Sequence, residues 1–416
     1  MRNALTRVGA FLIHRRIALA LTTPGHIRTS RNVQSIERAK RVNAHDATGG
    51  GAMRIAVSLF FALAMILFGA EMFTNAVEWL GRKLNLGQGA VGSVLAAIGT
   101  AMPETAVPVT AILFGNGAKD ATEVGIGGIL GAPFLLATLG SLIIAIALLT
   151  ARRPDLGNEL AVDKRGFSRD MSFFLLAYAV TVMTGAVQSR WLHSVAPFVL
   201  AGLYIVFVVF AIRDKQSTAD EAEHLNPLYL QWRKEEPSGW AVVLQLAISL
   251  GTIMGGAQLL TKGVEQLAMN FAIPAFVLSA LLIPLATELP ETFNSVVWIR
   301  QGKDGLAFGN ISGAMVFQST LVPALGIWLT PWKLNPQAMI TGGLTLCAAA
   351  MIFGLYRLSG KLSVGVFFAT SLLYWILPLQ LVAARYQLTS LYWISAVVVG
   401  VAFFLSLRTG LSYRSV

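Results

Sequence analysis

Long apolar runs alternate with short polar segments along almost the whole chain after Met53. Most runs have about 17 to 25 residues, which is the length that a helix needs to cross roughly 30 Å of hydrocarbon. The pattern therefore predicts an all-α polytopic membrane protein with eleven spans, over residues 55–78, 88–114, 123–150, 171–188, 195–212, 240–262, 274–299, 306–330, 336–356, 363–383 and 390–407.

Composition agrees with a membrane protein and excludes several other classes. The chain is 55% hydrophobic and 13% charged, a balance that a soluble domain of this size does not keep. Its net charge of +11 does not indicate a nucleic-acid partner, because residues 1–52 alone hold nine Lys and Arg and two acidic residues. The single cysteine, Cys347, excludes an intramolecular disulfide. All five histidines fall outside the predicted spans, which argues against a histidine-ligated metal enzyme.

Lysine and arginine are unevenly divided between alternate loops. If the first helix starts outside, the cytoplasmic segments hold 17 of them and the opposite loops hold five. Because cytoplasmic loops carry the excess, we expect an integral protein of the plasma (inner) membrane with its C-terminus in the cytoplasm. The basic tail would then have to be translocated, which leaves three interpretations of it: Met53 is the true initiator, the tail is a targeting peptide, or it is a disordered arm.

An internal repeat organises the chain. Gly69–Thr105 aligns with Gly256–Thr292 without a gap, at a constant offset of 187, and 11 of 37 positions are identical. The copies cover predicted spans one and two, and six and seven. Five spans separate them, so equivalent helices cross the membrane in opposite directions, as in many secondary transporters.

Similarity continues at an offset of 182, where Gly127 and Gly131 match Gly309 and Gly313. Each pair has a spacing that lets helix backbones approach closely, and packing is the simpler interpretation of these glycines. The repeat predicts two inverted five-helix repeats and an additional eleventh helix. The expected divisions are 1–52, a basic extension that is disordered or not translated; 53–212, the first repeat; 213–239, a cytoplasmic linker; 240–384, the second repeat; and 385–416, the C-terminal helix and tail.

Both halves carry the motif Thr-x-x-Pro-Glu-Thr inside a membrane span. Proline removes a backbone donor and opens the helix, and the threonine and glutamate four residues apart share one helix face. Hydroxyl, carboxylate and freed carbonyl oxygens then lie within one turn, which suits a hard cation such as Ca²⁺. A protonated structural glutamate is the competing interpretation, but two at equivalent places favour cation binding. The motif residues are Thr100, Pro103, Glu104 and Thr105, and Thr287, Pro290, Glu291 and Thr292.

At these residues the sequence resembles the sodium/calcium exchanger membrane region of the cation/calcium exchanger superfamily, in a divergent prokaryotic-type form. Its repeats carry Gly-Thr-Ser-Leu-Pro-Glu followed by Gly-Asn-x-x-Gly-Ser, matched here by GTAMPE, ATELPE and GNISGA. The resemblance covers about residues 54–384. It implies that ions are held by the second and third helices of each repeat, that the first helix of each acts as a gate, and that Thr100, Glu104, Thr287 and Glu291 are ion ligands.

The chain departs from that pattern at several ligand positions. Ala101 and Glu288 stand where the family usually has serine. On the third helix of each repeat, polar family residues are replaced by Ala132 and Leu136 in the first half and by Ala314 and Gln318 in the second. Glu288 lies three residues before Glu291, on the same helix face, and compensates in part, and Gln318 keeps one amide oxygen. The cation site is therefore expected to contain Glu104, Glu291, Thr100, Thr287, Glu288, Thr105, Thr292 and Gln318.

Three further carboxylates are candidates for gating or ion access. Glu78 and Glu265 are matched by the repeat near helix ends, where an interfacial position explains them equally well. Glu71 lies deeper in its span, and Gln258 occupies the equivalent place in the second half.

Taken together, these features favour a secondary cation antiporter that exports Ca²⁺ in exchange for Na⁺ or H⁺ by alternating access. Two alternatives stay open: a proton-coupled exchanger of monovalent cations, and a membrane scaffold or sensor that binds an ion without transporting it. No enzyme activity, cofactor or nucleotide is expected, because the chain contains no phosphate loop and no nucleophile with a neighbouring base in any span. The expected partners are inorganic cations and the bilayer. The sequence leaves the ion, the stoichiometry and the oligomeric state open.

Overall fold

The computed structural model describes residues 49–84, 101–115, 118–151, 159–215, 226–386, 388, 394–395 and 397–405. The chain divides into two units, Met1–Ala56 and Val57–Val416, and the fold and site below belong to the second. Most of the predicted N-terminal extension lies outside the described residues. The first described helix begins at Gly49, four residues before Met53.

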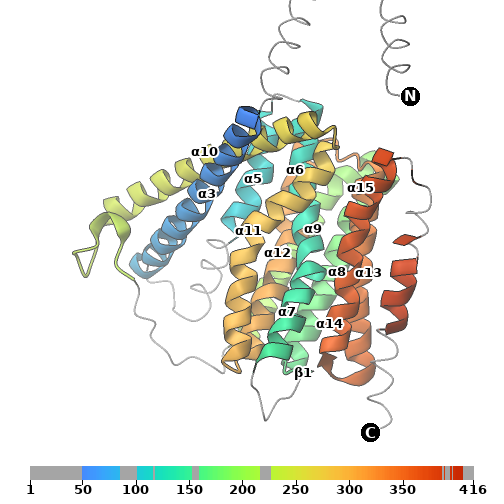
Figure 1. The fold of residues 1–416 in the computed structure, drawn as a ribbon. Coiled ribbons are helices and arrows are strands. Elements are labelled where there is room, and N and C mark those ends of the chain that lie inside the picture. Colours follow the sequence, from blue (N-terminus) through green and yellow to red (C-terminus); the bar gives the residue numbers. More distant parts are fainter. Residues whose placement is uncertain are drawn as a thin grey trace, which may run out of the picture. The chain divides into compact units, whose positions relative to one another are not determined.

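The described part of the second unit is almost entirely helical (Figure 1). Two-residue strands form its one short sheet. In chain order the elements are α3 (Gly49–Lys83), α5 (Met102–Phe114), α6 (Lys119–Ala137), α7 (Leu139–Thr150), β1 (Glu159–Leu160), α8 (Lys164–Val187), α9 (Arg190–Lys215), η1 (Tyr229–Gln231), α10 (Gly239–Phe271), α11 (Ala275–Arg300), α12 (Asp304–Leu329), α13 (Pro336–Ser359), β2 (Leu362–Ser363), α14 (Val364–Ser371), η2 (Leu372–Trp375) and α15 (Ile376–Tyr386).

The prediction of an all-α polytopic membrane protein is confirmed. In the described ranges, eight helical segments are long and apolar enough to cross a membrane, and the bent helix α11 makes a ninth. The predicted span 88–114 is described only from residue 101 onward. The predicted span 390–407 is described only in part, so the eleventh helix stays a prediction. The inverted repeat and the domain limits also stay predictions.

Three apolar clusters of the described residues hold the helices together. The main core lies among α6 to α9 and α11 to α14, and a smaller cluster joins α3 and α10 to α5, α6 and α11. A third, small cluster packs the end of α3 against Leu228 and the start of α10. Helices α3 and α10 run side by side (Figure 1), and a Cβ placed on Gly256 of α10 would lie 2.9 Å from the carbonyl oxygen of Ala62 on α3. Small residues at such a contact let two helix backbones approach closely. The largest fully buried side chains of the main core include Phe134, Phe174, Tyr178, Phe276, Trp332 and Phe367.

Loops that the charge pattern assigns to the same side of the membrane contact each other. The loops after α7 and after α13 pair through β1 and β2, with Lys361 Nζ 3.2 Å from Glu159 Oε1. At the opposite helix ends, His193 Nε2 lies 3.0 Å from the carbonyl oxygen of Thr330. Which end faces the cytoplasm stays a prediction.

The last part of the predicted linker is bound to α3 and α10. The carbonyl oxygen of Asn226 accepts hydrogen bonds from Asn75 Nδ2 and Trp79 Nε1, at 3.2 and 2.9 Å. Gln245 of α10 donates to Asn75 Oδ1 at 2.9 Å and accepts from the backbone N–H of Leu230 at 3.0 Å. These bonds tie the start of the second half to the end of α3.

Candidate cation site

The first-half motif opens helix α5. Pro103 lies in the first turn, where the missing N–H costs nothing because no helical partner exists there. Glu104 follows it and is only 4% exposed. Neither carboxylate oxygen of Glu104 has a hydrogen-bond partner from another described residue. Thr100, a predicted ligand, lies outside the described residues together with the segment that precedes it.

The second-half motif bends helix α11. The parts Ala275–Leu289 and Glu291–Arg300 meet at an angle of 46°, on either side of Pro290. Proline has no backbone N–H to donate, so a helix lacks one hydrogen bond at this position, which accounts for the bend. This geometry agrees with the predicted interruption of the span at its Pro-Glu step.

Both carboxylates of the bent helix are held by amides from α12. Gln318 Nε2 donates to Glu288 Oε1 at 2.6 Å, and Asn310 Nδ2 donates to Glu291 Oε2 at 2.9 Å. Glu288 is fully buried, and Glu291 is partly buried. The other oxygen of Glu288 and the amide oxygen of Gln318 have no hydrogen-bond partner among the described residues. Two polar oxygens of this pair are therefore available to a ligand.

Three predicted ligands come together from two helices. Glu104 on α5 and Glu288 and Glu291 on α11 lie close enough for their charges to interact. Such like charges repel strongly in a buried setting, and a bound cation relieves that repulsion. Within the described ranges no three Asp, Glu, His or Cys side chains are close enough to hold a metal ion by themselves. A cation here would need further oxygens from hydroxyls, backbone or water.

The threonine hydroxyls of the motifs bond to the backbone one turn earlier. Thr105 donates to the carbonyl oxygen of Ala101 at 2.9 Å, and Thr292 donates to that of Glu288 at 2.8 Å. Thr287 makes the equivalent bond to Ile283 at 3.3 Å. Each hydroxyl oxygen keeps lone pairs after donating its hydrogen, so the bonds are compatible with a ligand role. That role stays a prediction for all three.

Asn310 was not among the predicted site residues, yet it contacts Glu291 directly. The available signal was its place in the Gly-Asn-x-x-Gly-Ser motif, two turns before Gln318 on the same helix. In the first half, the corresponding helix α6 carries Ala132 and Leu136, both buried and apolar. The polar support is thus provided by α12, and no described side chain of α6 supplies it to Glu104.

The first glycine pair lies against the backbone of another helix. A Cβ on Gly127 would lie 2.7 Å from the carbonyl oxygen of Phe276, and one on Gly131 would lie 2.7 Å from the Cα of Ala280. Helix α6 therefore packs backbone to backbone against α11, as the spacing predicted. Nothing in the described part of the chain lies within 4 Å of a Cβ on Gly309 or Gly313, so close packing of the second pair stays a prediction.

The candidate gating residues lie in separate surroundings. Glu71 is exposed and accepts a hydrogen bond from Tyr229 Oη of the linker at 3.2 Å. Burial and the facing carboxylate of Glu71 raise the pKa of Tyr229, which keeps this phenol protonated as a donor. Glu78 is partly buried, and Glu265 interacts electrostatically with Asp120 and Lys262. Their roles in access stay predictions.

Comparison with known proteins identifies the family. The profile described as "Sodium/calcium exchanger protein" matches residues 54–213 and 241–409. A proposed antiporter, CaxA of Alkalimonas amylolytica, is 24% identical over 310 residues, covering 74% of this chain and 91% of that protein. The inner membrane protein YrbG of Escherichia coli is 24% identical over 335 residues, covering 77% and 97%.

The fold has a solved counterpart. The crystal structure of an H⁺/Ca²⁺ exchanger, CAX, superimposes with a TM-score of 0.63 at 17% identity, over 87% of this chain and 88% of that one. At that identity the likeness speaks for the fold alone, and the profile match speaks for the family. The chain therefore belongs to the sodium/calcium exchanger protein family, whose members are membrane transporters of ions that need no cofactor and are not enzymes.

Proposed function

We propose that this protein is a secondary antiporter that exports Ca²⁺ in exchange for Na⁺ or H⁺. The observation that carries the proposal is a set of buried polar oxygens without a hydrogen-bond partner among the described residues: both carboxylate oxygens of Glu104 on α5, one of Glu288 on α11 and the amide oxygen of Gln318 on α12. The partly buried Glu291 follows Glu288 by three residues on the same helix. Three carboxylates form a strongly negative site, which a divalent cation neutralises better than a single monovalent ion does. Replacement of Ca²⁺ by Na⁺ or H⁺ at the same carboxylates would couple the two fluxes.

Alternating access follows from where these carboxylates are located. They come from the second helix of each predicted repeat, so a relative movement of the two halves changes the side from which the ions are reached. Thr100, Thr105, Thr287, Thr292 and Gln318 would complete the coordination. The apolar Ala132 and Leu136 of α6 favour one alternative, a proton-coupled exchanger of monovalent cations, because fewer oxygens surround the ion.

The test is ⁴⁵Ca²⁺ uptake into proteoliposomes under an outward Na⁺ gradient and, separately, an outward H⁺ gradient. We expect one gradient to drive uptake, and Glu104→Gln and Glu291→Gln to reduce it to background. The control Glu159→Gln removes a carboxylate that pairs with Lys361 in the β1–β2 loops, and it should transport normally. If neither gradient drives Ca²⁺ while a Na⁺/H⁺ assay gives flux that needs Glu104, the monovalent alternative replaces the calcium assignment.

The proposed orientation places the start of α3 outside and the C-terminus in the cytoplasm of the inner membrane, as the loop charges predict. Cys347 is the only cysteine, so a Cys347→Ser background allows single reporters. Ser189→Cys should react with an impermeant maleimide on intact cells, and Ser359→Cys should react only after permeabilisation. The reverse pattern would overturn the orientation without affecting the transport proposal.

A further inference from the structure

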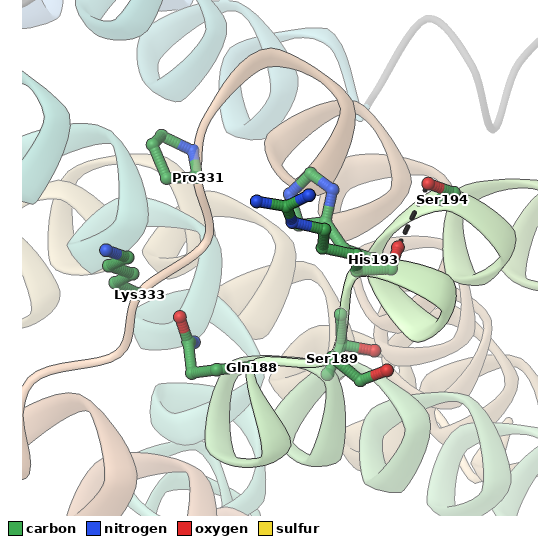
Figure 2. A pocket seen from close by; sticks show the side chains of 8 residues that line it. Gln188, Ser189, His193, Ser194, Pro331 and Lys333 are labelled. Atoms are coloured by element: carbon green, nitrogen blue, oxygen red, sulfur yellow. Dashed lines mark hydrogen bonds between the residues drawn. The ribbon is translucent and has the colours of Figure 1, made fainter.

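A cavity of about 370 Å³ lies outside the cation site, between the ends of α8 and α12 and the starts of α9 and α13. Figure 2 shows Gln188, His193 and Lys333 around it. None of its lining residues belongs to the carboxylate cluster or to the gating candidates. The proposed transport cycle therefore gives this cavity no role.

Specific contacts build its walls. Gln188 and Trp332 adopt left-handed backbone conformations, with φ of 53° and 45°, which non-glycine residues rarely do. Gln188 Nε2 donates to the carbonyl oxygen of Trp332 at 3.1 Å, and the buried Trp332 Nε1 donates to that of Thr181 at 3.0 Å. His193 joins the same two loops through the carbonyl oxygen of Thr330. The cavity is thus pre-formed by two loops that are bound to each other.

The lining is cationic. It contains Arg190, Lys333 and His193 and no carboxylate. Neither Arg190 nor Lys333 forms an ion pair with a described residue. His193 Nε2 faces a carbonyl oxygen and so carries the hydrogen of that bond. No carboxylate in this lining balances the two cations, and Arg and Lys are the side chains that bind phosphate.

Two exposed tryptophans lie on the same helix ends, Trp191 in the first turn of α9 and Trp328 in the last turn of α12. Trp191, next to Arg190, is 71% exposed, and Trp328, near the end of α12, is 63% exposed and packs edge-on against Phe198 with ring centroids 5.4 Å apart. Tryptophan is enriched at the level of the lipid headgroups. The cavity lies at the ends of apolar spans, where headgroup phosphates are abundant.

We propose that Arg190 and Lys333 form a binding site for a phosphate group, supplied by the headgroup of an anionic lipid or by free phosphate. The Arg190 guanidinium would donate hydrogen bonds to two phosphate oxygens, and the Lys333 ammonium would add a second positive charge. The hydroxyl of Ser189 lies in the same lining as a further donor. A lipid held here would bridge the α8–α9 and α12–α13 loops.

The experiment compares two double variants with the unaltered protein. Arg190→Gln/Lys333→Gln removes both cations of the cavity. Lys119→Gln/Lys262→Gln is the matched control, because it removes the same charge from helices α6 and α10, at positions predicted on the same side of the membrane. Native mass spectrometry of delipidated protein measures binding of phosphatidylglycerol and of phosphatidylcholine. Calorimetry in a neutral detergent measures binding of inorganic phosphate.

We expect phosphatidylglycerol to bind the unaltered protein and the control alike, and the cavity variant to bind it about tenfold more weakly. If the same loss extends to inorganic phosphate, the site accepts the free anion; if only the lipid is affected, the headgroup is the ligand. Equal binding of both probes to all three proteins would overturn the proposal. Size-exclusion profiles identify a variant that has unfolded, and Arg190→Lys, which keeps the charge, should then retain binding.

Discussion

The two predicted halves carry the same Pro-Glu motif but support it differently. In the first half Glu104 is buried without a partner from another described residue, and α6 presents glycine backbone to α11. In the second half Glu288 and Glu291 each accept an amide hydrogen bond from α12. The motif is shared, whereas the surrounding chemistry is not.

Helices α6 and α12 therefore contribute differently to the site. A close helix contact leaves room for glycine but none for a polar side chain, so α6 contributes packing. Helix α12 carries the amides of Asn310 and Gln318, so it contributes orientation of the carboxylates. A bound cation should stabilise the Glu104 carboxylate most, because a buried charge without a partner is costly in free energy.

The largest expected effect comes from disrupting the close packing of α6 against α11. Gly131→Ala places a Cβ against the backbone of Ala280, which cannot move without shifting α11. We expect a loss of about 3 kcal/mol in unfolding free energy. Thermal unfolding in detergent, followed by near-UV circular dichroism, measures the loss, and an unchanged stability would contradict the close contact between α6 and α11.

The second-largest expected effect concerns the hydrogen bond that the Gln318 amide donates to Glu288. Gln318→Leu leaves the buried Glu288 without its donor, and we expect this to cost about 2 kcal/mol. The same substitution in a Glu288→Leu background should cost much less, because no buried carboxylate is then left unsatisfied. A double-mutant cycle on unfolding free energies gives the coupling. Additive costs would mean that the hydrogen bond contributes nothing.

A smaller effect of opposite sign is expected at Glu104. In Ca²⁺-free buffer, Glu104→Gln removes a buried charge that no described residue partners, and the protein should be stabilised by about 1 kcal/mol. Added Ca²⁺ should stabilise the unaltered protein and leave this variant unchanged. Differential scanning fluorimetry with and without Ca²⁺ measures both. Destabilisation by Glu104→Gln would indicate a partner in the segment before residue 101.

The smallest expected effect concerns the hydrogen bond from Asn310 to Glu291. Its amide orients Glu291, and the repeat-equivalent position in the first half is Gly128, which has no side chain to do so. Asn310→Ala should raise the KM for Ca²⁺ about threefold with little change in kcat, because binding loses orientation but keeps its charges. Asn310→Asp should not rescue it, since a second carboxylate cannot donate. An unchanged KM would remove Asn310 from the site.

The carboxylates of the site were predictable because each motif is local. Proline and glutamate adjacent in an apolar run, repeated at a fixed offset, identified Glu104 and Glu291 without any contact information. Glu288 and Gln318 entered as departures from a family pattern, and the structure joins them in one hydrogen bond. Asn310 could not be assigned to Glu291, since the pairing depends on the rotation of α12 against the bent α11.

The glycines illustrate the same limit. The spacing in the two pairs is identical, and it predicted close packing for both; the described residues show that the backbone against Gly127 and Gly131 is that of α11, and they leave the second pair untested. Spacing fixes which residues share a helix face. The spacing does not determine which neighbouring helix that face contacts.

The sequence by itself determined the membrane class, the helical architecture and the buried carboxylates, because hydrophobic length, charge and motif are properties of single segments. Only the tertiary structure decided that amides of α12 hold Glu288 and Glu291, that Glu104 receives no such bond from the described residues, and that two distant loops enclose a cationic cavity. Those features arise where helices far apart in the chain pack against one another. Their relative rotation follows from the packing of the whole bundle, which no single segment encodes.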